Sequence, residues 1–298
     1  MARLGWLILA VLAFAAVLWW LARPADLPQA TLNALQAHSA DPENGERIFW
    51  AAGCAGCHAA PGIGSSDPVE ARLVLAGGRR LESPFGIFVA PTVSPDPRQG
   101  IGAWSLDDFA RAMLNGVSPD GAHYYPSFPY TTYTRARPED VADLWAFWQT
   151  LPEDDTPSAA HELPFPFTLR GGLGLWKLLN LSADHVFPET GDAQLMRGRY
   201  LVEALGHCAE CHTPRNLAGG LDVGRWMGGA PNPAGEGRIP PIPDPRWSAE
   251  DIEGYLFSGF TPDFDVVGGS MTDVVQHMAQ LPAEDRAAIA AYLRALID

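Results

Sequence analysis

The chain has 298 residues, enough for two domains of about 100–150 residues each, and 47% of them are hydrophobic. Its formal net charge of −15 argues against a nucleic-acid partner, because phosphates require a basic binding surface. The same charge fits either attraction toward basic partner proteins or ordinary acidic solubility.

The first predicted element is a long apolar helix. Residues 4–22 carry no charge and include Trp19 and Trp20 near their end. As a helix they span about 28 Å, close to the thickness of the hydrocarbon core of a bilayer, and tryptophan favours the membrane interface. A cleaved signal peptide is the alternative, although its apolar region is usually only about 7–15 residues. We expect residues 1–23 to be a membrane anchor of an exported protein, followed by a tether over 24–42.

Two copies of Cys-x-x-Cys-His contain all four cysteines of the chain. Their residues are Cys54, Cys57 and His58 in the first motif, and Cys208, Cys211 and His212 in the second. This pattern is typical of c-type haem attachment, in which two thiols add to the haem vinyl groups and the histidine becomes an axial iron ligand. A zinc site or a redox dithiol would explain the cysteine pairs but not the histidine after each pair. We therefore expect two covalently bound haem c groups.

Helices are predicted on both sides of each motif. Before and after the first motif they cover residues 45–52 with Asn44 as the N-cap, 106–115 with Ser105 as the N-cap, and 138–151. The region between, residues 59–103, is rich in Gly and Pro and is predicted to form loops. Domain one is assigned to residues 43–152.

The same order recurs in residues 191–298, which are assigned to domain two. Helices are predicted over 192–205, 249–258 and 282–296, with a Gly- and Pro-rich loop over 213–246. Residues 104–108 (WSLDD) match residues 247–251 (WSAED), and Gly116 matches Gly259 at the same offset of 143. This internal duplication predicts an all-α fold in which strands have little place. Residues 153–190 between the modules are predicted to be an interdomain strap that covers the seam or serves as a docking surface.

A six-coordinate haem needs a distal ligand, usually Met or His. For the second haem we expect Met271, in the loop before the last helix, whereas Met227 and Met278 are interpreted as packing residues. The corresponding loop of the first module, residues 120–130, contains no Met. His123 is its only strong ligand and is the predicted distal ligand of the first haem. The alternative is a surface histidine with the iron left five-coordinate.

Four segments carry a resemblance to a known family: residues 90–96 (APTVSPD), 125–130 (YPSFPY), 163–167 (LPFPF) and 206–216 (GHCAECHTPRN). Through them, residues 40–298 resemble the multihaem cytochrome c subunits of bacterial membrane-associated dehydrogenases for alcohol, gluconate or aldehyde. The resemblance implies two tandem class I-like cytochrome c domains and supports Met271. Many members carry three haems and a C-terminal anchor, and many have a distal Met where this chain has Phe128.

The resulting expectation is a dihaem electron carrier, not an enzyme, anchored by its N-terminal helix on the periplasmic side of the bacterial cytoplasmic membrane. It would take electrons from a periplasmic dehydrogenase and pass them to a soluble cytochrome, an oxidase or a quinone. A dihaem peroxidase is the alternative, with Glu70 or Glu82 as the distal base of a five-coordinate first haem. A structural subunit that uses haem only for folding is a third interpretation.

Overall fold

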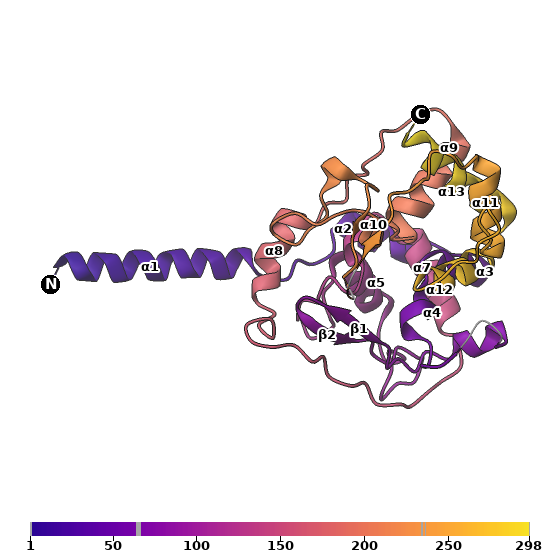
Figure 1. Ribbon diagram of the computed structural model, residues 1–298. Coiled ribbons are helices and arrows are strands. Elements are labelled where there is room, and N and C mark those ends of the chain that lie inside the picture. The colour runs from indigo at the N-terminus through magenta and orange to yellow at the C-terminus, as the bar shows by residue number, and fades with distance from the viewer. Residues whose placement is uncertain (1, 64–66, 234, 236, 298) are drawn as a thin grey trace.

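The computed structural model describes residues 2–63, 67–233, 235 and 237–297, and shows one long helix that projects from a helix-rich body (Figure 1). The projecting helix is α1 (Ala2–Leu21). The window Arg3–Leu21 has a mean hydropathy of 2.4, and none of it is buried in the protein. A tether with helix α2 (Gln29–Ala37) leads from α1 to the body. Residues 64–66, 234 and 236, which belong to the two long predicted loops, lie outside the described part.

The body contains two groups of helices, each built around one motif. The elements of the first group are α3 (Pro42–Ala51), α4 (Cys54–His58), η1 (Val69–Leu73), β1 (Arg80–Ser83), β2 (Gly86–Val89), α5 (Leu106–Asn115), α6 (Tyr130–Tyr133) and α7 (Pro138–Trp148). Those of the second are α9 (Ala193–Tyr200), the π-helical turn η2 (Leu201–Leu205), α10 (Ala209–His212), η3 (Val223–Arg225), β3 (Ala230–Pro231), β4 (Arg238–Ile239), α11 (Ala249–Ser258), α12 (Met271–Met278) and α13 (Ala283–Ala295). Helix α8 (Gly172–Asn180) lies in the strap between them.

Local capping explains why the middle helix of each group begins and ends where the sequence predicts. Ser105 and Asp108 form a reciprocal capping box at the start of α5, and Ser248 and Asp251 form the same box at the start of α11. Each box satisfies backbone N–H groups that the first turn leaves without partners. Both helices end at a left-handed glycine, Gly116 with φ 60° and Gly259 with φ 76°.

One local prediction is wrong. Helix α3 begins earlier than predicted because Asp41, not Asn44, is its N-cap: the Asp41 carboxylate accepts hydrogen bonds from the Glu43 and Asn44 amides. The Asn44 side chain instead donates to the Asp143 carboxylate on α7, at 2.7 Å. Strands also occur, as two short antiparallel hairpins, β1–β2 and β3–β4. The loops around each motif use these ladders to pair backbone groups that no helix satisfies.

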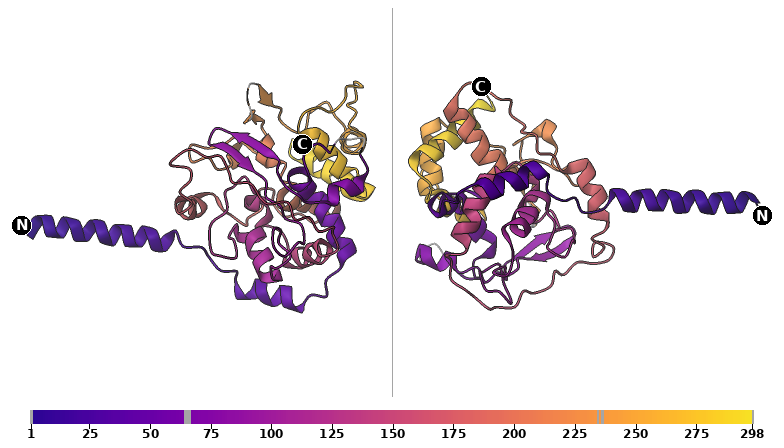
Figure 2. Two further views of the ribbon diagram at one scale, coloured as in Figure 1. Left: turned by 90° about the horizontal axis from the view of Figure 1, so that it is seen from below. Right: turned by 180° about the vertical axis from the view of Figure 1, so that it is seen from behind.

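Glycine allows the first and last helices of each group to cross closely. A Cβ atom at Gly45 on α3 would lie 2.1 Å from the Asp143 carbonyl oxygen on α7. A Cβ atom at Gly198 on α9 would lie 1.9 Å from the Ala288 carbonyl oxygen on α13. Both distances are far below van der Waals contact, so only glycine permits these crossings. The two groups thus share the same helix pairing, and the views in Figure 2 show them side by side.

Candidate haem-attachment sites

The first motif forms helix α4, directly after Gly53, whose φ of 64° turns the chain out of α3. His58 Nδ1 donates a hydrogen bond to the Pro91 carbonyl oxygen at 2.9 Å. The Gly77 amide donates to the His58 carbonyl oxygen at 2.8 Å. The loop after the motif therefore returns to hold the histidine on both its ring and its backbone.

The second motif repeats this arrangement around α10. His212 Nδ1 donates to the Pro240 carbonyl oxygen at 2.8 Å, and the Gly229 amide donates to the His212 carbonyl oxygen at 2.7 Å. In each motif, a histidine is thus fixed by a proline carbonyl and a glycine amide from the loop that follows.

These hydrogen bonds determine which ring nitrogen is free. A carbonyl oxygen only accepts, so Nδ1 carries the proton in both histidines and Nε2 keeps its lone pair. Burial lowers the pKa of His58 and of His212, although each hydrogen bond to a proline carbonyl opposes the shift. A neutral imidazole with a free Nε2 and an anchored Nδ1 is the form that binds a metal. The donor set therefore fits a proximal haem ligand at both positions.

The four thiols also fit covalent haem. All four cysteines are free rather than disulfide-bonded. Burial raises the pKa of Cys54 and of Cys208 to about 12. Within the described residues, no group of three or more Cys, His, Asp or Glu side chains is arranged to hold a metal ion.

The two motifs meet in the centre of the body, at two histidines that sequence reasoning missed. A Cβ atom at Gly53 would lie 3.4 Å from His207 Nε2 and 3.6 Å from His277 Nδ1. His207 directly precedes the second motif, and His277 lies on α12, so both reach the first motif from the second group. Burial raises the pKa of the Cys57 thiol, and the nearby Cys211 thiol raises it further. Groups attached at the two motifs would therefore be neighbours.

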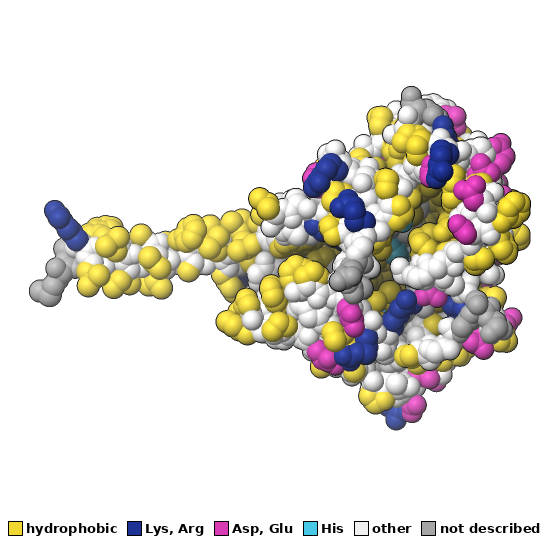
Figure 3. All heavy atoms as spheres, viewed as in Figure 1, with side chains coloured by type: hydrophobic (Ala, Val, Ile, Leu, Met, Phe, Trp, Pro, Cys, Tyr) yellow, Lys and Arg dark blue, Asp and Glu magenta, His cyan; other side chains and the backbone are white. Residues whose placement is uncertain are grey.

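His277 also supplies a polar atom that the protein leaves unsatisfied. Its side chain is 2% exposed, and His277 Nε2 has no hydrogen-bond partner among the described residues. Leaving such an atom unpaired costs about 1–3 kcal/mol, which a bound group in this region would offset. Figure 3 shows a hollow in the middle of one face of the body with a histidine side chain at its bottom. The only sequence signal for His207 is its place beside Cys208.

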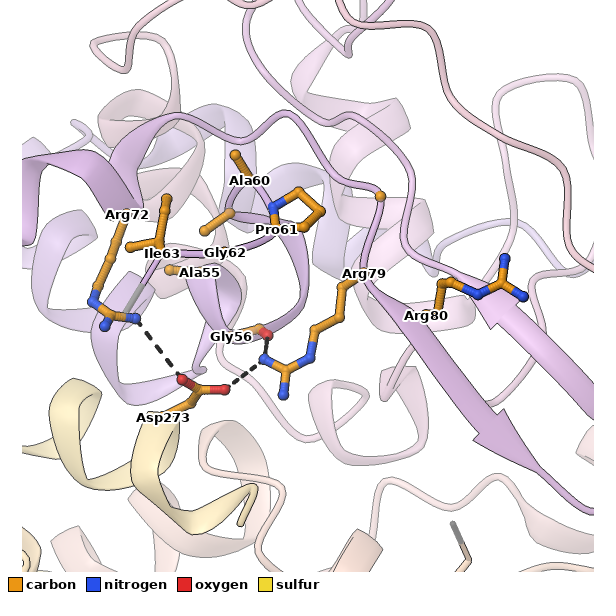
Figure 4. Close-up of a pocket in the computed structure, with 12 residues that line it drawn as sticks. Ala55, Gly56, Ala60, Pro61, Gly62, Ile63, Arg72, Arg79, Arg80 and Asp273 are labelled. Carbon is orange, nitrogen blue, oxygen red and sulfur yellow. Dashed lines mark hydrogen bonds and ion pairs between the residues drawn. The ribbon is translucent and has the colours of Figure 1, made fainter. Parts of the chain in front are cut away.

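In each group, the helix that precedes the last one contacts the region of the other group's motif. These helices are α6 and α12. From α6, Thr131 Oγ1 donates to the Glu210 carboxylate in the second motif at 2.7 Å. From α12, Asp273 pairs with Arg79 at 2.5 Å and lies 3.9 Å from Arg72, and Arg79 also donates to the Gly56 carbonyl of the first motif (Figure 4). These residues line a cavity of about 410 Å³ beside the first motif. Each group thus contacts the motif region of the other.

The structure places Met271 at the first residue of α12 rather than in a loop, and its side chain is half-buried. Isolated β-bridges identify its counterpart in the first group. Val117 pairs with His123, and Phe260 pairs with Val266, again at an offset of 143. His123 therefore corresponds to Val266, and Phe128 corresponds to Met271.

His123 lies in a different setting from the predicted one. Its Nε2 donates to the Ala22 carbonyl oxygen, just after α1, at 2.8 Å. Its Nδ1 lies 3.1 Å from Lys177 Nζ, from which it accepts. Both ring nitrogens are thus engaged with protein atoms, and an iron bond would require one of these contacts to break. The buried His123 side chain joins the end of α1 to α8.

Several characterised proteins are similar to most of the chain. Residues 42–152 match the cytochrome c family. A diheme cytochrome c-type protein of Cereibacter sphaeroides is 52% identical over 97% of this chain and 95% of its own length. The fructose dehydrogenase cytochrome subunit of Gluconobacter japonicus is 36% identical over 87% of this chain and 53% of its own length. The cytochrome c subunit of the quinone alcohol dehydrogenase of Gluconobacter oxydans is 30% identical over 93% of this chain and 60% of its own length. The chain thus spans little more than half of these two subunits.

Paired Cys-x-x-Cys-His motifs with anchored histidines define a c-type cytochrome, which binds haem covalently and transfers electrons. The chain belongs to the family of dihaem c-type cytochromes, and it is similar to the cytochrome subunits of fructose dehydrogenase and quinone alcohol dehydrogenase. It is an electron-transfer protein rather than a catalytic subunit. Glu70 and Glu82, the bases that a peroxidase would need, are both exposed.

Proposed function

We propose that this chain is a membrane-anchored dihaem cytochrome c that carries electrons away from a periplasmic dehydrogenase. The observation that carries the proposal is the repeated geometry of the two motifs. In both, the histidine Nδ1 donates to a proline carbonyl and leaves Nε2 free. One such motif would be compatible with a single-haem protein. Two motifs whose histidines make the same hydrogen bond to a proline carbonyl support one haem c at each motif.

The residues proposed to hold the haems are Cys54, Cys57 and His58 for the first, and Cys208, Cys211, His212 and Met271 for the second. Haem supplies one-electron exchange at iron, and the protein tunes its potential through axial ligands and burial. We revise the role of His123: it holds the end of α1, and Phe128 occupies the distal position in the first group. Residues 43–152 and 191–298 are proposed as two cytochrome c domains.

Helix α1 is proposed as the membrane anchor, and haem attachment favours a compartment for the body. None of its apolar window is buried in the protein, and its length and hydropathy suit a bilayer. Covalent haem attachment in bacteria takes place outside the cytoplasmic membrane, which favours the periplasmic side for the body. The named relatives favour a dehydrogenase as electron donor. A soluble cytochrome, an oxidase or a quinone is the proposed acceptor.

Single substitutions in each motif test the two-site proposal. Cys54→Ala and Cys208→Ala should each remove one covalent haem and leave the other, measured by intact mass and haem staining of the purified variants. Cys→Ala at both positions together should remove both. Loss of both haems from either single variant would contradict independent sites. Co-purification from solubilised membranes tests the dehydrogenase partner.

A further inference from the structure

A patch of exposed hydrophobic side chains lies beside the end of α1. Its members, here called the apolar patch, are Phe165 (79% exposed), Phe167 (41%), Leu169 (62%), Leu178 (60%), Leu179 (78%) and Leu217 (110%). Exposed apolar side chains gathered in this way mark an interaction site rather than ordinary surface. Neither haem attachment nor packing between the two groups uses them.

Contacts along α8 hold the patch together. The Trp176 indole donates to the Ala218 carbonyl oxygen at 2.8 Å, which fixes the loop bearing Leu217 against the helix. On the other side, the Phe167 ring packs edge-on against Phe85, with centroids 5.0 Å apart. The patch is thus a built surface made of segments distant in sequence.

The end of α1 is seated directly against α8. A Cβ atom at Gly174 would lie 2.1 Å from the Ala22 carbonyl oxygen, so the two backbones touch. The same carbonyl accepts from His123, and Lys177 Nζ donates to the Asn115 and Gly116 carbonyl oxygens at 2.7 Å each. Both Figure 1 and Figure 2 place α8 beside the end of α1. The patch therefore has a fixed position relative to the apolar helix.

Charge and aromatic residues at this end fit a lipid surface. The whole chain has a net charge of −15, yet residues 163–180 contain no Asp or Glu. Arg170 in this segment is half-buried, whereas Lys177 is buried and bonded to backbone carbonyls. On α1 itself, Trp19 and Trp20 lie near the same end, and the Arg23 guanidinium stacks over Trp19 at 4.3 Å. Tryptophan and arginine in this position are typical of the membrane interface. In Figure 3, hydrophobic side chains cover α1 and continue onto the adjoining edge of the body.

We propose that the apolar patch lies in the interface of the same bilayer that α1 spans, and so fixes the orientation of the body over the membrane. The inference rests on the proposed role of α1 as an anchor. Because the contact between Ala22 and α8 fixes the patch beside the end of α1, a bilayer that α1 spans also receives the patch at its interface. Surface segments that bury apolar side chains at the headgroup level act in this way.

Spin-label depth measurements test the proposal with the full-length holoprotein in nanodiscs. In the holoprotein, the four native cysteines are held as thioethers, so one added cysteine takes the label. Three variants are compared: Leu9→Cys on α1, Leu179→Cys in the patch, and Ile297→Cys, an exposed apolar residue near the C-terminus. Relaxation by oxygen, which concentrates in lipid, is compared with relaxation by a water-soluble nickel chelate. Unchanged haem spectra confirm that the labelled proteins are folded.

We expect the ratio of oxygen to nickel relaxation to be several-fold higher at residues 9 and 179 than at residue 297. If residue 9 is lipid-exposed but residue 179 matches residue 297, the patch proposal is wrong while the anchor stands. The same conclusion follows if residue 179 becomes shielded only when a dehydrogenase is added. If residue 9 itself matches residue 297, the anchor fails.

Discussion

At the scale of single residues, the most informative contacts are those that hold the two motif histidines. A proline carbonyl fixes the tautomer of each ring, and such a partner also raises the basicity of the coordinating nitrogen. Because the partner is a backbone atom, side-chain substitution at Pro91 or Pro240 leaves it in place. In the two proposed haem sites, the hydrogen bond to the proximal histidine is thus robust to side-chain substitution, and the distal residue is the proposed difference between them.

Met271 is the proposed distal ligand of the second site. Met271→Ala should lower the potential of one haem and leave the other unchanged, because a methionine ligand raises the potential. It should also remove the weak long-wavelength absorption of a Met–iron bond. Potentiometric titration of wild type and variant, followed by absorption, measures both, with Met278→Leu as a control that keeps the buried volume. An unchanged titration would refute the assignment.

The distal side of the first site depends on which residue faces the iron. Because both nitrogens of His123 are engaged with Ala22 and Lys177, His123→Ala should leave the haem spectra unchanged. Phe128→Met should instead raise the potential of one haem, since Phe128 is the counterpart of Met271. Electron paramagnetic resonance of the oxidised proteins reports the ligation. A new high-spin signal in His123→Ala would restore the bis-histidine interpretation.

The sequence predicts the motif residues directly, whereas His123 as the distal ligand of the first site is predicted only by elimination. Cys and His at fixed spacing identify an attachment site by themselves, because the chemistry is local. Ligand strength alone favours His123 within a loop that lacks Met. Its partners are separated from it by 101 residues at Ala22 and 54 at Lys177, so no local pattern could show them.

At the scale of elements, close helix crossings set the shape of each group. The α9–α13 crossing at Gly198 and the α3–α7 crossing at Gly45 both place backbone against backbone. Apolar periodicity and capping residues in the sequence indicate these helices, and the bounds of α5 and α11 match the prediction to the residue. Periodicity and capping do not show where two helices cross, because a glycine inside a helix can occur for reasons other than a close crossing.

Gly198→Ala should lower the free energy of unfolding by at least about 1–3 kcal/mol, because the methyl group would overlap the Ala288 carbonyl. Gly254→Ala is the matched control, since Gly254 also lies inside a helix, α11, and a Cβ atom there meets nothing within 4 Å. Chemical denaturation of both holoproteins measures the difference. Equal stability of the two variants would show that the crossing is not tightly packed.

At the scale of the whole molecule, the two groups are joined through their motifs and tied to α1 through α8. Internal duplication is visible in the sequence as the offset of 143. The contacts of Thr131 and Asp273 between the groups are not visible in the sequence. They join surfaces whose pairing depends on how the two groups dock.

The full-length protein should remain in the membrane fraction after washing with concentrated salt, because α1 is held by hydrophobic burial and salt screens only charge. Immunoblotting of washed membranes, with N-terminal sequencing of the product, checks this. Release of a soluble protein that begins near residues 24–27 would show that residues 1–23 are a cleaved signal peptide.

The central claim is that one chain carries two electron-transfer haems, one at each motif. A potentiometric titration of the purified holoprotein, followed at the haem absorption band, tests it most directly. We predict two one-electron components of equal amplitude, each lost selectively in the Cys54→Ala or Cys208→Ala variant. A single component, with the other motif carrying no haem, would contradict the claim.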